Sequence, residues 1–434
     1  MRRRAMQALL VTNLSVMQKP NQKGGALIIF AVILVLAATA FLISQLNGSS
    51  VKIERDKTTA EALAKAKIAL IGWSISRGRV GTERPGELPC PDTDEPGTIS
   101  YGLAEGTCVA GKVGRFPWKS VGSEELKDGY GEPLWYAVDG AFRVRFGVSP
   151  TTNRPINSDS RASMQIYAED GITLITQAGD EVAAVIFAPG YPTNGQSRSP
   201  GSSTTCPATG TNILENRCAT NYLELQNGRN NSINNGPFIR GKKTDIFNDS
   251  LIFIYASKLM SVTEKRVGKD LKNILENYHT ANGYYPYPAR FDTVGCLDVD
   301  SNASVSDCES DATICRGRLP DKALPSDWAA GYLLPNWFEY NLWGQTIFYS
   351  VGTDSLASIP ADCSNNLTVD LTNHESLFIL AGTPIGTKIR NNLTQSLVLS
   401  DYLEDLENQD SWDLVANNLY IKPTTVGDSL YVLP

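Results

Sequence analysis

The eight cysteines are the residues best suited to chemistry in this chain, and disulfide formation is the chemistry that their pattern indicates. All of them follow residue 89, and no two have the C-x-x-C spacing that is typical of zinc sites. The two histidines, His279 and His374, lie far from cysteine clusters in the sequence. The sequence therefore predicts disulfides rather than zinc ligation, and disulfides persist outside the cytoplasm.

One acidic segment has the ligand spacing of a calcium loop. Positions 1, 3, 5 and 12 of an EF-hand-type loop carry Asp298, Asp300, Asn302 and Glu309. Position 6 is Ala303 instead of glycine, so a solvated acidic turn is the alternative interpretation. Residues 91–94 form a smaller acidic turn of the same kind. Calcium is the one possible ligand that these patterns suggest, and no other cofactor is expected.

Catalytic motifs are absent from the sequence. It contains no G-x-S-x-G elbow, P-loop, H-E-x-x-H or helix-opening G-x-G-x-x-G. A carboxylate pair suited to hydrolysis leaves no sequence signature, because its spacing is spatial. We expect a protein without enzymatic activity, with an unrecognised hydrolase as a lesser alternative.

An internal repeat organises the elements that carry these residues. The segment AVIFAPGYPTNGQSR, 184–198, matches SLFILAGTPIGTKIR, 376–390, without a gap. Tyr-Leu-Glu at 222–224 and 402–404 and Asp-Ser-Leu at 249–251 and 428–430 follow in the same order, and Gly-Arg recurs at 114 and 317. The sequence thus predicts two copies of one module.

Each copy retains an arginine and a glutamate. The pairs are Arg198 with Glu224, and Arg390 with Glu404. A buried or half-buried ion pair between arginine and a carboxylate inside each module would explain them, and an exposed arginine that binds a ligand is the alternative.

The repeat also suggests how the cysteines pair. Cys90 would bond to Cys108, and Cys296 to Cys315, at corresponding places in the two copies. Cys206 and Cys218 would close a local loop, which leaves Cys308 and Cys363.

Short apolar runs between turn residues predict the strands of an antiparallel sheet. The absence of alternating strands and helices argues against a parallel α/β fold. We expect strands at 133–138, 164–167, 182–188, 251–255, 345–351, 377–381 and 430–433.

The run from Gly24 to Ile43 contains 20 residues without a charge, enough for a helix to cross a bilayer. Five basic residues and no acidic residue precede it, which places the N-terminus in the cytoplasm. The formal charge of −7 leaves the rest of the chain acidic, so nucleic acid is not an expected partner. A cleaved signal peptide is the alternative, with the small residues at 37–40 near its cleavage site.

The basic leader, Lys23-Gly24-Gly25 and the apolar run resemble the N-terminus of type IV pilins and of the pseudopilins of type II secretion. The resemblance implies that a prepilin peptidase cuts after Gly25, which makes Ala26 the first mature residue, with Gly24 as the other candidate. Major subunits of the family carry glutamate at the fifth mature position, where this chain has Phe30. This departure fits a minor subunit at the filament tip, a class that includes calcium-binding proteins.

We therefore expect an α+β fold in which one helix from Ala26 to about Arg77, amphipathic in its second half, precedes two tandem modules of a helix and an antiparallel sheet. The predicted divisions are a leader at 1–25, a transmembrane segment at 26–46, a first module at 47–256 and a second module at 257–434.

The expected function is assembly of a type IV pilus or a type II secretion filament, at the tip. The implied partners are other pilin or pseudopilin subunits, the prepilin peptidase and the bacterial inner membrane, with most of the chain in the periplasm. A single-pass, membrane-anchored periplasmic binding protein or adhesin is the alternative.

Overall fold

The computed structural model describes residues 25–78, 83–109, 111–144, 155–193, 195, 196, 198, 218–290, 310–320, 334–352, 356, 367–385, 390, 398–410, 418–423 and 427–434. For residues 25–49, 339, 340 and 410 it describes the backbone only. The chain forms two units, residues 1–56 and 57–434.

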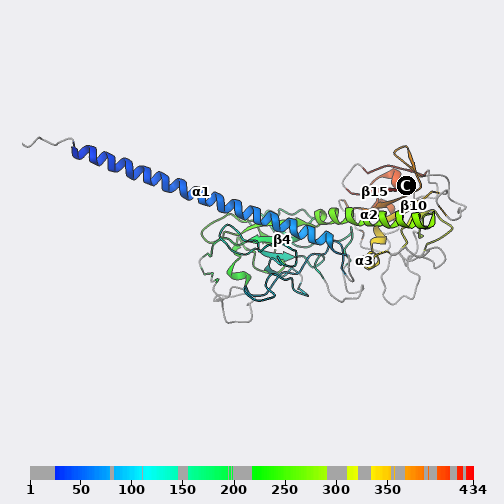
Figure 1. The fold of residues 1–434 in the computed structure, drawn as a ribbon, viewed down its shortest axis with the longest axis horizontal. Coiled ribbons are helices and arrows are strands. Elements are labelled where there is room, and N and C mark those ends of the chain that lie inside the picture. The colour runs from blue at the N-terminus through cyan, green and yellow to red at the C-terminus, as the bar shows by residue number, and fades with distance from the viewer. Residues whose placement is uncertain are drawn as a thin grey trace, which may run out of the picture. The chain divides into compact units, whose positions relative to one another are not determined.

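Helix α1, Gly25–Ser76, enters both units (Figure 1). Its bounds agree with the predicted helix from Ala26 to about Arg77. In the second unit, one side of the helix is buried, at spacings of three and four residues, as expected of an amphipathic helix. This side consists of Thr59, Ala62, Leu63, Ala66, Leu70 and Ser74.

The predicted membrane segment, residues 26–46, forms part of this helix, but its side chains lie outside the described residues. Within the part of the chain that the structure describes, no helix combines the length and apolar character needed to span a membrane.

A first antiparallel sheet has the strand order β1-β2-β4-β8. Its strands are β1 (Val113–Arg115), β2 (Trp135–Val138), β4 (Val182–Ala188) and β8 (Ser250–Tyr255). All seven residues of β4 are buried, which explains why this strand reads as one continuous apolar run in the sequence.

A second antiparallel sheet has the order β9-β10-β13-β15. Its strands are β9 (Arg316–Arg318), β10 (Ile347–Val351), β13 (Ser376–Leu380) and β15 (Ser429–Leu433). Taken in chain order, the four strands of each sheet have the same neighbours, so the two sheets have one topology. The predicted α+β class with antiparallel sheets is confirmed.

Helix α2, Ala256–Asn282, begins directly after β8 (Figure 1). It contacts β15 of the second sheet as well as β4 and β8 of the first. Gly283 adopts a left-handed conformation (φ 76°) that ends the helix, and its N–H bonds to the His279 carbonyl at 2.7 Å. Because α2 contacts both sheets, its buried side chains join a core that includes residues from each of them.

The remaining elements are short. Two parallel pairs, β3 with β7 and β11 with β14, have corresponding places in the chain order, because their strands precede the third and the fourth strand of each sheet. Their bounds, and those of the other short elements, are β3 Ile166–Tyr167, β5 Leu225–Gln226, β6 Arg229–Asn230, β7 Phe238–Ile239, β11 Leu367–Val369, β12 Thr372–His374, β14 Leu419–Tyr420, α3 Asn336–Tyr340, α4 Leu399–Tyr402, α5 Leu406–Asp410, and the 3-10 helices η2 Ala219–Asn221 and η4 Trp343–Thr346.

Candidate functional site

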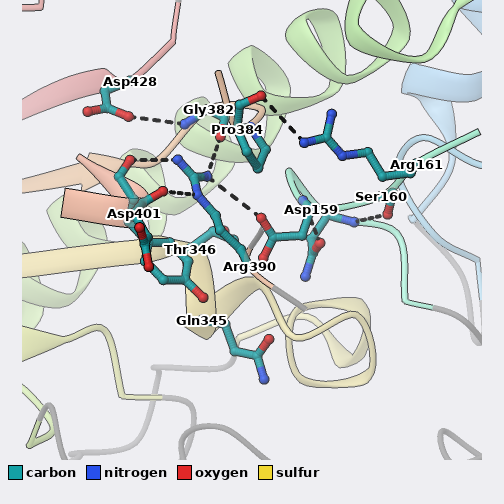
Figure 2. Close-up of polar contacts among 12 residues, drawn as sticks. Asp159, Ser160, Arg161, Gln345, Thr346, Gly382, Pro384, Arg390, Asp401 and Asp428 are labelled. Atoms are coloured by element: carbon teal, nitrogen blue, oxygen red, sulfur yellow. Dashed lines mark hydrogen bonds and ion pairs between the residues drawn. The ribbon is translucent and has the colours of Figure 1, made fainter. Parts of the chain in front are cut away.

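Arg390 lies at the centre of a buried polar cluster (Figure 2). Its Nη1 donates to the Gly382 carbonyl at 2.6 Å and its Nη2 to the Tyr402 carbonyl at 2.8 Å, while its Nε donates to the Asp401 carbonyl. The guanidinium carbon lies 4.7 Å from the centre of the Tyr402 ring, in range for a cation–π contact. The arginine thus connects the loop after β13 to the Tyr-Leu-Glu segment.

Arg198 makes the corresponding contacts beside the first sheet. It donates to the Gly190 carbonyl at 2.7 Å and to the Asn221 carbonyl at 3.0 Å, and its guanidinium carbon lies 4.6 Å from the Tyr222 ring. The same geometry at two matching places shows that this arginine is used to hold backbone segments together, which favours the structural interpretation of the repeated arginine.

The carboxylate partners differ between the two sites. Arg198 pairs at 3.1 Å with Glu132, a carboxylate of the same predicted module, where the repeat suggested Glu224. Arg390 lies 3.6 Å from Glu404 and also 3.6 Å from Asp159, which comes from the part of the chain around the first sheet. The sequence could not reveal Glu132 or Asp159, because neither is near its arginine along the chain.

Glu224 instead forms a carboxyl pair with Asp249, the residue before β8. The Glu224 N–H donates to Asp249 Oδ2 at 2.9 Å, and the Asp249 N–H donates to Glu224 Oε2 at 3.2 Å. Burial raises the pKa of both carboxyls, and the nearby Glu224 charge raises that of Asp249 further. This reciprocal bonding ties the Tyr-Leu-Glu segment to the start of the last strand.

Glu404 and Asp428 repeat one of these two bonds before β15. The Glu404 N–H donates to Asp428 Oδ2 at 3.0 Å, and the Gly382 N–H donates to Asp428 Oδ1 at 3.3 Å. Burial and the adjoining Glu404 side chain raise the pKa of Asp428 to about 8. The two Asp-Ser-Leu repeats are thus explained by one function, which is to receive the Tyr-Leu-Glu backbone.

A second pair of arginines is buried in the strands β1 and β9. Arg115 Nη1 donates to the Asp94 carbonyl at 2.8 Å, and Arg318 Nη1 donates to the Gly344 and Gln345 carbonyls at 3.0 and 2.9 Å. Burial lowers the pKa of Arg318 to about 10. The repeated Gly-Arg dipeptide is the sequence signal for these residues, although the repeat alone does not indicate their role.

The Cys90–Cys108 disulfide forms as predicted. Cys218 and Cys315 are disulfide-bonded as well. The other four cysteines, Cys206, Cys296, Cys308 and Cys363, lie outside the described residues, as do the proposed calcium ligands Asp298, Asp300, Asn302 and Glu309.

The smaller acidic turn, 91–94, approaches Glu105 within the loop that this disulfide closes. Oxygens of Asp92, Asp94 and Glu105 lie within 4.8 Å of one another, close enough to hold a metal ion. The oxygens of Asp92 also accept the N–H groups of Gly102 at 2.7 Å and Asp94 at 2.8 Å. Burial raises the pKa of Asp92 to about 6, although these N–H groups oppose the shift. These bonds already stabilise the turn.

Of the predicted leader residues, Gly24 lies outside the described residues, and Gly25 and Ala26 form the first turn of α1. Comparison with protein families, curated proteins and solved structures finds nothing that matches this chain.

Proposed function

We propose that this chain is a minor, tip-type subunit of a type IV pilus or of a type II secretion pseudopilus. The observation that carries the proposal is the position and length of α1, which begins at Gly25, beside the Lys-Gly-Gly sequence, and continues for 52 residues. Its buried side in the second unit faces an antiparallel sheet, and its first half contains the uncharged run. A long helix that is apolar at one end and attached to a sheet at the other suits subunits that assemble through their helices.

We further propose that the two sheets belong to two copies of one module, with the boundary at the transition from β8 to α2. The shared strand order, the two arginines bonded to matching carbonyls, and the two carboxyl pairs support this duplication. In each copy a helix precedes the sheet: α1 in the first and α2 in the second. The first copy would then carry the membrane anchor in addition to its share of the head.

The proposed mechanism is a transfer of the apolar half of α1 from lipid to a helical bundle. Lipid and neighbouring helices are both apolar, so the transfer needs close packing rather than a hydrophobic driving force. Phe30 replaces the glutamate that would otherwise require a neighbouring subunit's N-terminal amine. A subunit with a double head and without this charge suits a terminal position, where only one neighbour must be accommodated.

The test is the intact mass and N-terminal sequence of the full chain, purified from membranes of cells with and without a prepilin peptidase. We expect a mature chain that starts at Ala26, N-methylated, only when the peptidase is present. Gly25→Leu should abolish this cut and Gly24→Leu should preserve it. An uncut wild-type chain would overturn the proposal in favour of an anchored binding protein or adhesin, and a cut near residue 40 would indicate a secreted protein.

A further inference from the structure

Residues 155–161, which precede β3, contact residues that belong with the second sheet. The Ile156 N–H donates to Asn341 Oδ1 at 2.9 Å, and Asn157 Nδ2 donates to the Asn341 carbonyl at 3.0 Å. Arg161 Nη2 reaches the Pro384 carbonyl at 3.4 Å (Figure 2). We call these contacts, together with the neighbouring Asp159, Glu264, Arg390 and Glu404, the junction. Ile156 and Asn341 are fully buried, so the junction is an interior contact.

Three carboxylates at the junction have buried oxygens without a hydrogen bond. These are both oxygens of Asp159, Oε1 of Glu264 on α2, and both oxygens of Glu404. Buried polar atoms are nearly always hydrogen-bonded in folded proteins, because a buried group without a partner has lost its bonds to water. Arg390 lies 3.6 Å from Asp159 and from Glu404, so Glu264 is the one of the three that has no ion pair among the described residues.

The positive charges that face these carboxylates come from three elements. Arg390, in the loop after β13, makes ion pairs with Asp159 and Glu404, and these are the ion pairs of the junction among the described residues. Arg161, on the same segment as Asp159, and Arg318, on β9, add weaker attraction to Asp159. Arg161 and Arg318 also donate to backbone carbonyls.

The groups that face Glu264 are mainly acidic. Asp159 and Glu404 repel its charge, while Arg390 and the Ser158 hydroxyl favour it. Tyr431, on β15, faces it as well. Full ionisation of Asp159, Glu264 and Glu404 would therefore place three negative charges around Arg390, whose side chain is completely buried.

Burial raises the pKa values of Glu264 and Asp159 toward neutrality. It raises the pKa of Glu264 to about 7 and that of Asp159 to about 6, with Arg390 opposing both shifts. Asp428, which faces Glu404, has a pKa of about 8. Asp159, Glu264 and Asp428 therefore hold protons in mildly acidic solution and lose them between about pH 6 and pH 8.

We propose that the junction is a pH-sensitive latch, which is closed while Glu264 is protonated and loosens when Glu264 becomes charged beside Asp159 and Glu404. In the closed state a protonated Glu264 adds no charge beside Asp159 and Glu404. In the charged state the three carboxylates repel one another, and the residues 155–161 separate from Asn341. This separation would let the part of the chain around the first sheet move more freely relative to the part around the second sheet.

The test is hydrogen exchange of the full chain in detergent micelles at pH 5.5 and pH 8.0, expressed as protection factors so that the intrinsic pH dependence is removed. The Ile156 N–H reports the junction directly, because it bonds to Asn341. We expect its protection to fall roughly tenfold at pH 8.0, the effect of about one unit of differential proton affinity. The amide of Ile186, in the centre of β4, should keep its protection and serves as the internal control.

Glu264→Gln keeps the shape of the side chain but cannot ionise, so it should reduce the loss of protection at pH 8.0 to within about twofold. Glu61→Gln, at an exposed position of α1, is the matched control and should behave as the wild type. Equal protection of Ile156 at both pH values in the wild type would overturn the proposal, whether or not the variants fold. An undiminished loss in folded Glu264→Gln would also overturn it.

Discussion

Asn341 is a single residue on which two distant parts of the chain depend. Its Oδ1 accepts the Ile156 N–H, its carbonyl accepts Asn157 Nδ2, and its own Nδ2 donates to the Trp337 carbonyl at 2.9 Å. The side chain is fully buried, so water cannot replace these bonds when they are lost. Asn341 therefore holds residues 155–161 in place through hydrogen bonds that solvent cannot supply.

Asn341→Ala should lower the free energy of unfolding by about 1–3 kcal/mol, because it leaves the buried Ile156 N–H without its side-chain partner at this position. Urea denaturation followed by tryptophan fluorescence measures the change. Asn273→Ala, at an exposed position of α2, is the control and should change the stability by less than about 0.5 kcal/mol. Similar losses in the two variants would contradict this role of Asn341.

The partners of individual side chains were the part of the site that sequence could not supply. The repeat identified Arg198, Arg390, Glu224 and Glu404 as structural residues, and both arginines do hold backbone carbonyls. The repeat could not show that Glu224 bonds to backbone N–H groups, because a pairing depends on distances in space. Such distances follow from loop conformations, which carry no periodic signal.

At the scale of elements, the strands β1 and β9 each carry a glycine that a neighbouring segment approaches closely. A Cβ at Gly114 would lie 2.7 Å from the Asp92 carbonyl oxygen, and one at Gly317 would lie 1.9 Å from the Ala289 carbonyl oxygen. Asp92 and Ala289 pair with Arg115 and Arg318 through matching isolated bridges. The repeated Gly-Arg dipeptide therefore allows a fifth segment to lie against the edge of each sheet.

Gly317→Ala should lower the free energy of unfolding by about 3 kcal/mol, because backbone must move to accommodate the methyl group. Gly344→Ala is the matched control, since the nearest atom to its Cβ would be 3.7 Å away. Its change should stay within about 1 kcal/mol, and guanidinium denaturation of both variants measures the difference. An equally mild effect at Gly317 would show that the bridge to Ala289 is dispensable.

The longer elements were predictable and the shorter ones were not. The predicted strand 182–188 has the same bounds as β4, because a fully buried strand is a continuous apolar run with clear ends. The strands β1 and β9 have three residues each with glycine in the centre, so they lack both length and periodicity. The hairpin of β11 and β12 was missed because it is short and its second strand is mostly polar.

At the scale of the whole molecule, buried carboxyls should make stability depend on pH. Burial raises the pKa of Asp92 and Asp159 to about 6, of Glu264 to about 7 and of Asp428 to about 8. In the unfolded chain such groups lose their protons near pH 4. The folded state therefore binds more protons between about pH 4 and pH 8, and its stability falls as the pH rises through this range.

We therefore expect the urea midpoint of unfolding to be higher at pH 5 than at pH 8. Glu264→Gln should reduce the difference, since it removes one of the raised groups from the titration. Glu61→Gln should leave the difference unchanged, because this side chain is exposed. A midpoint that rises from pH 5 to pH 8 would contradict the assignment of these carboxyls as buried and protonated.

The two sheets should also unfold together, because α2 contacts strands of both and its buried side chains belong to a shared core. Hydrogen exchange at increasing urea concentrations should show the amides of β4 and β13 losing protection at the same midpoint. Loss of β13 protection well before that of β4 would show that the second sheet is an independent unit.

Each of the two sheets takes its strands from one continuous part of the chain. The first sheet uses only residues 113–255 and the second only residues 316–433, so no strand of the first waits for a strand of the second. In the proposed function the residues after α1 reach the periplasm in chain order, so the first sheet can form while the residues of the second are still unexported. The Ile156 N–H then lacks its partner until Asn341 emerges, 185 positions after Ile156. If the chain is exported as proposed, its first half exposes this N–H during that interval, and we expect it to need a periplasmic chaperone until Asn341 arrives.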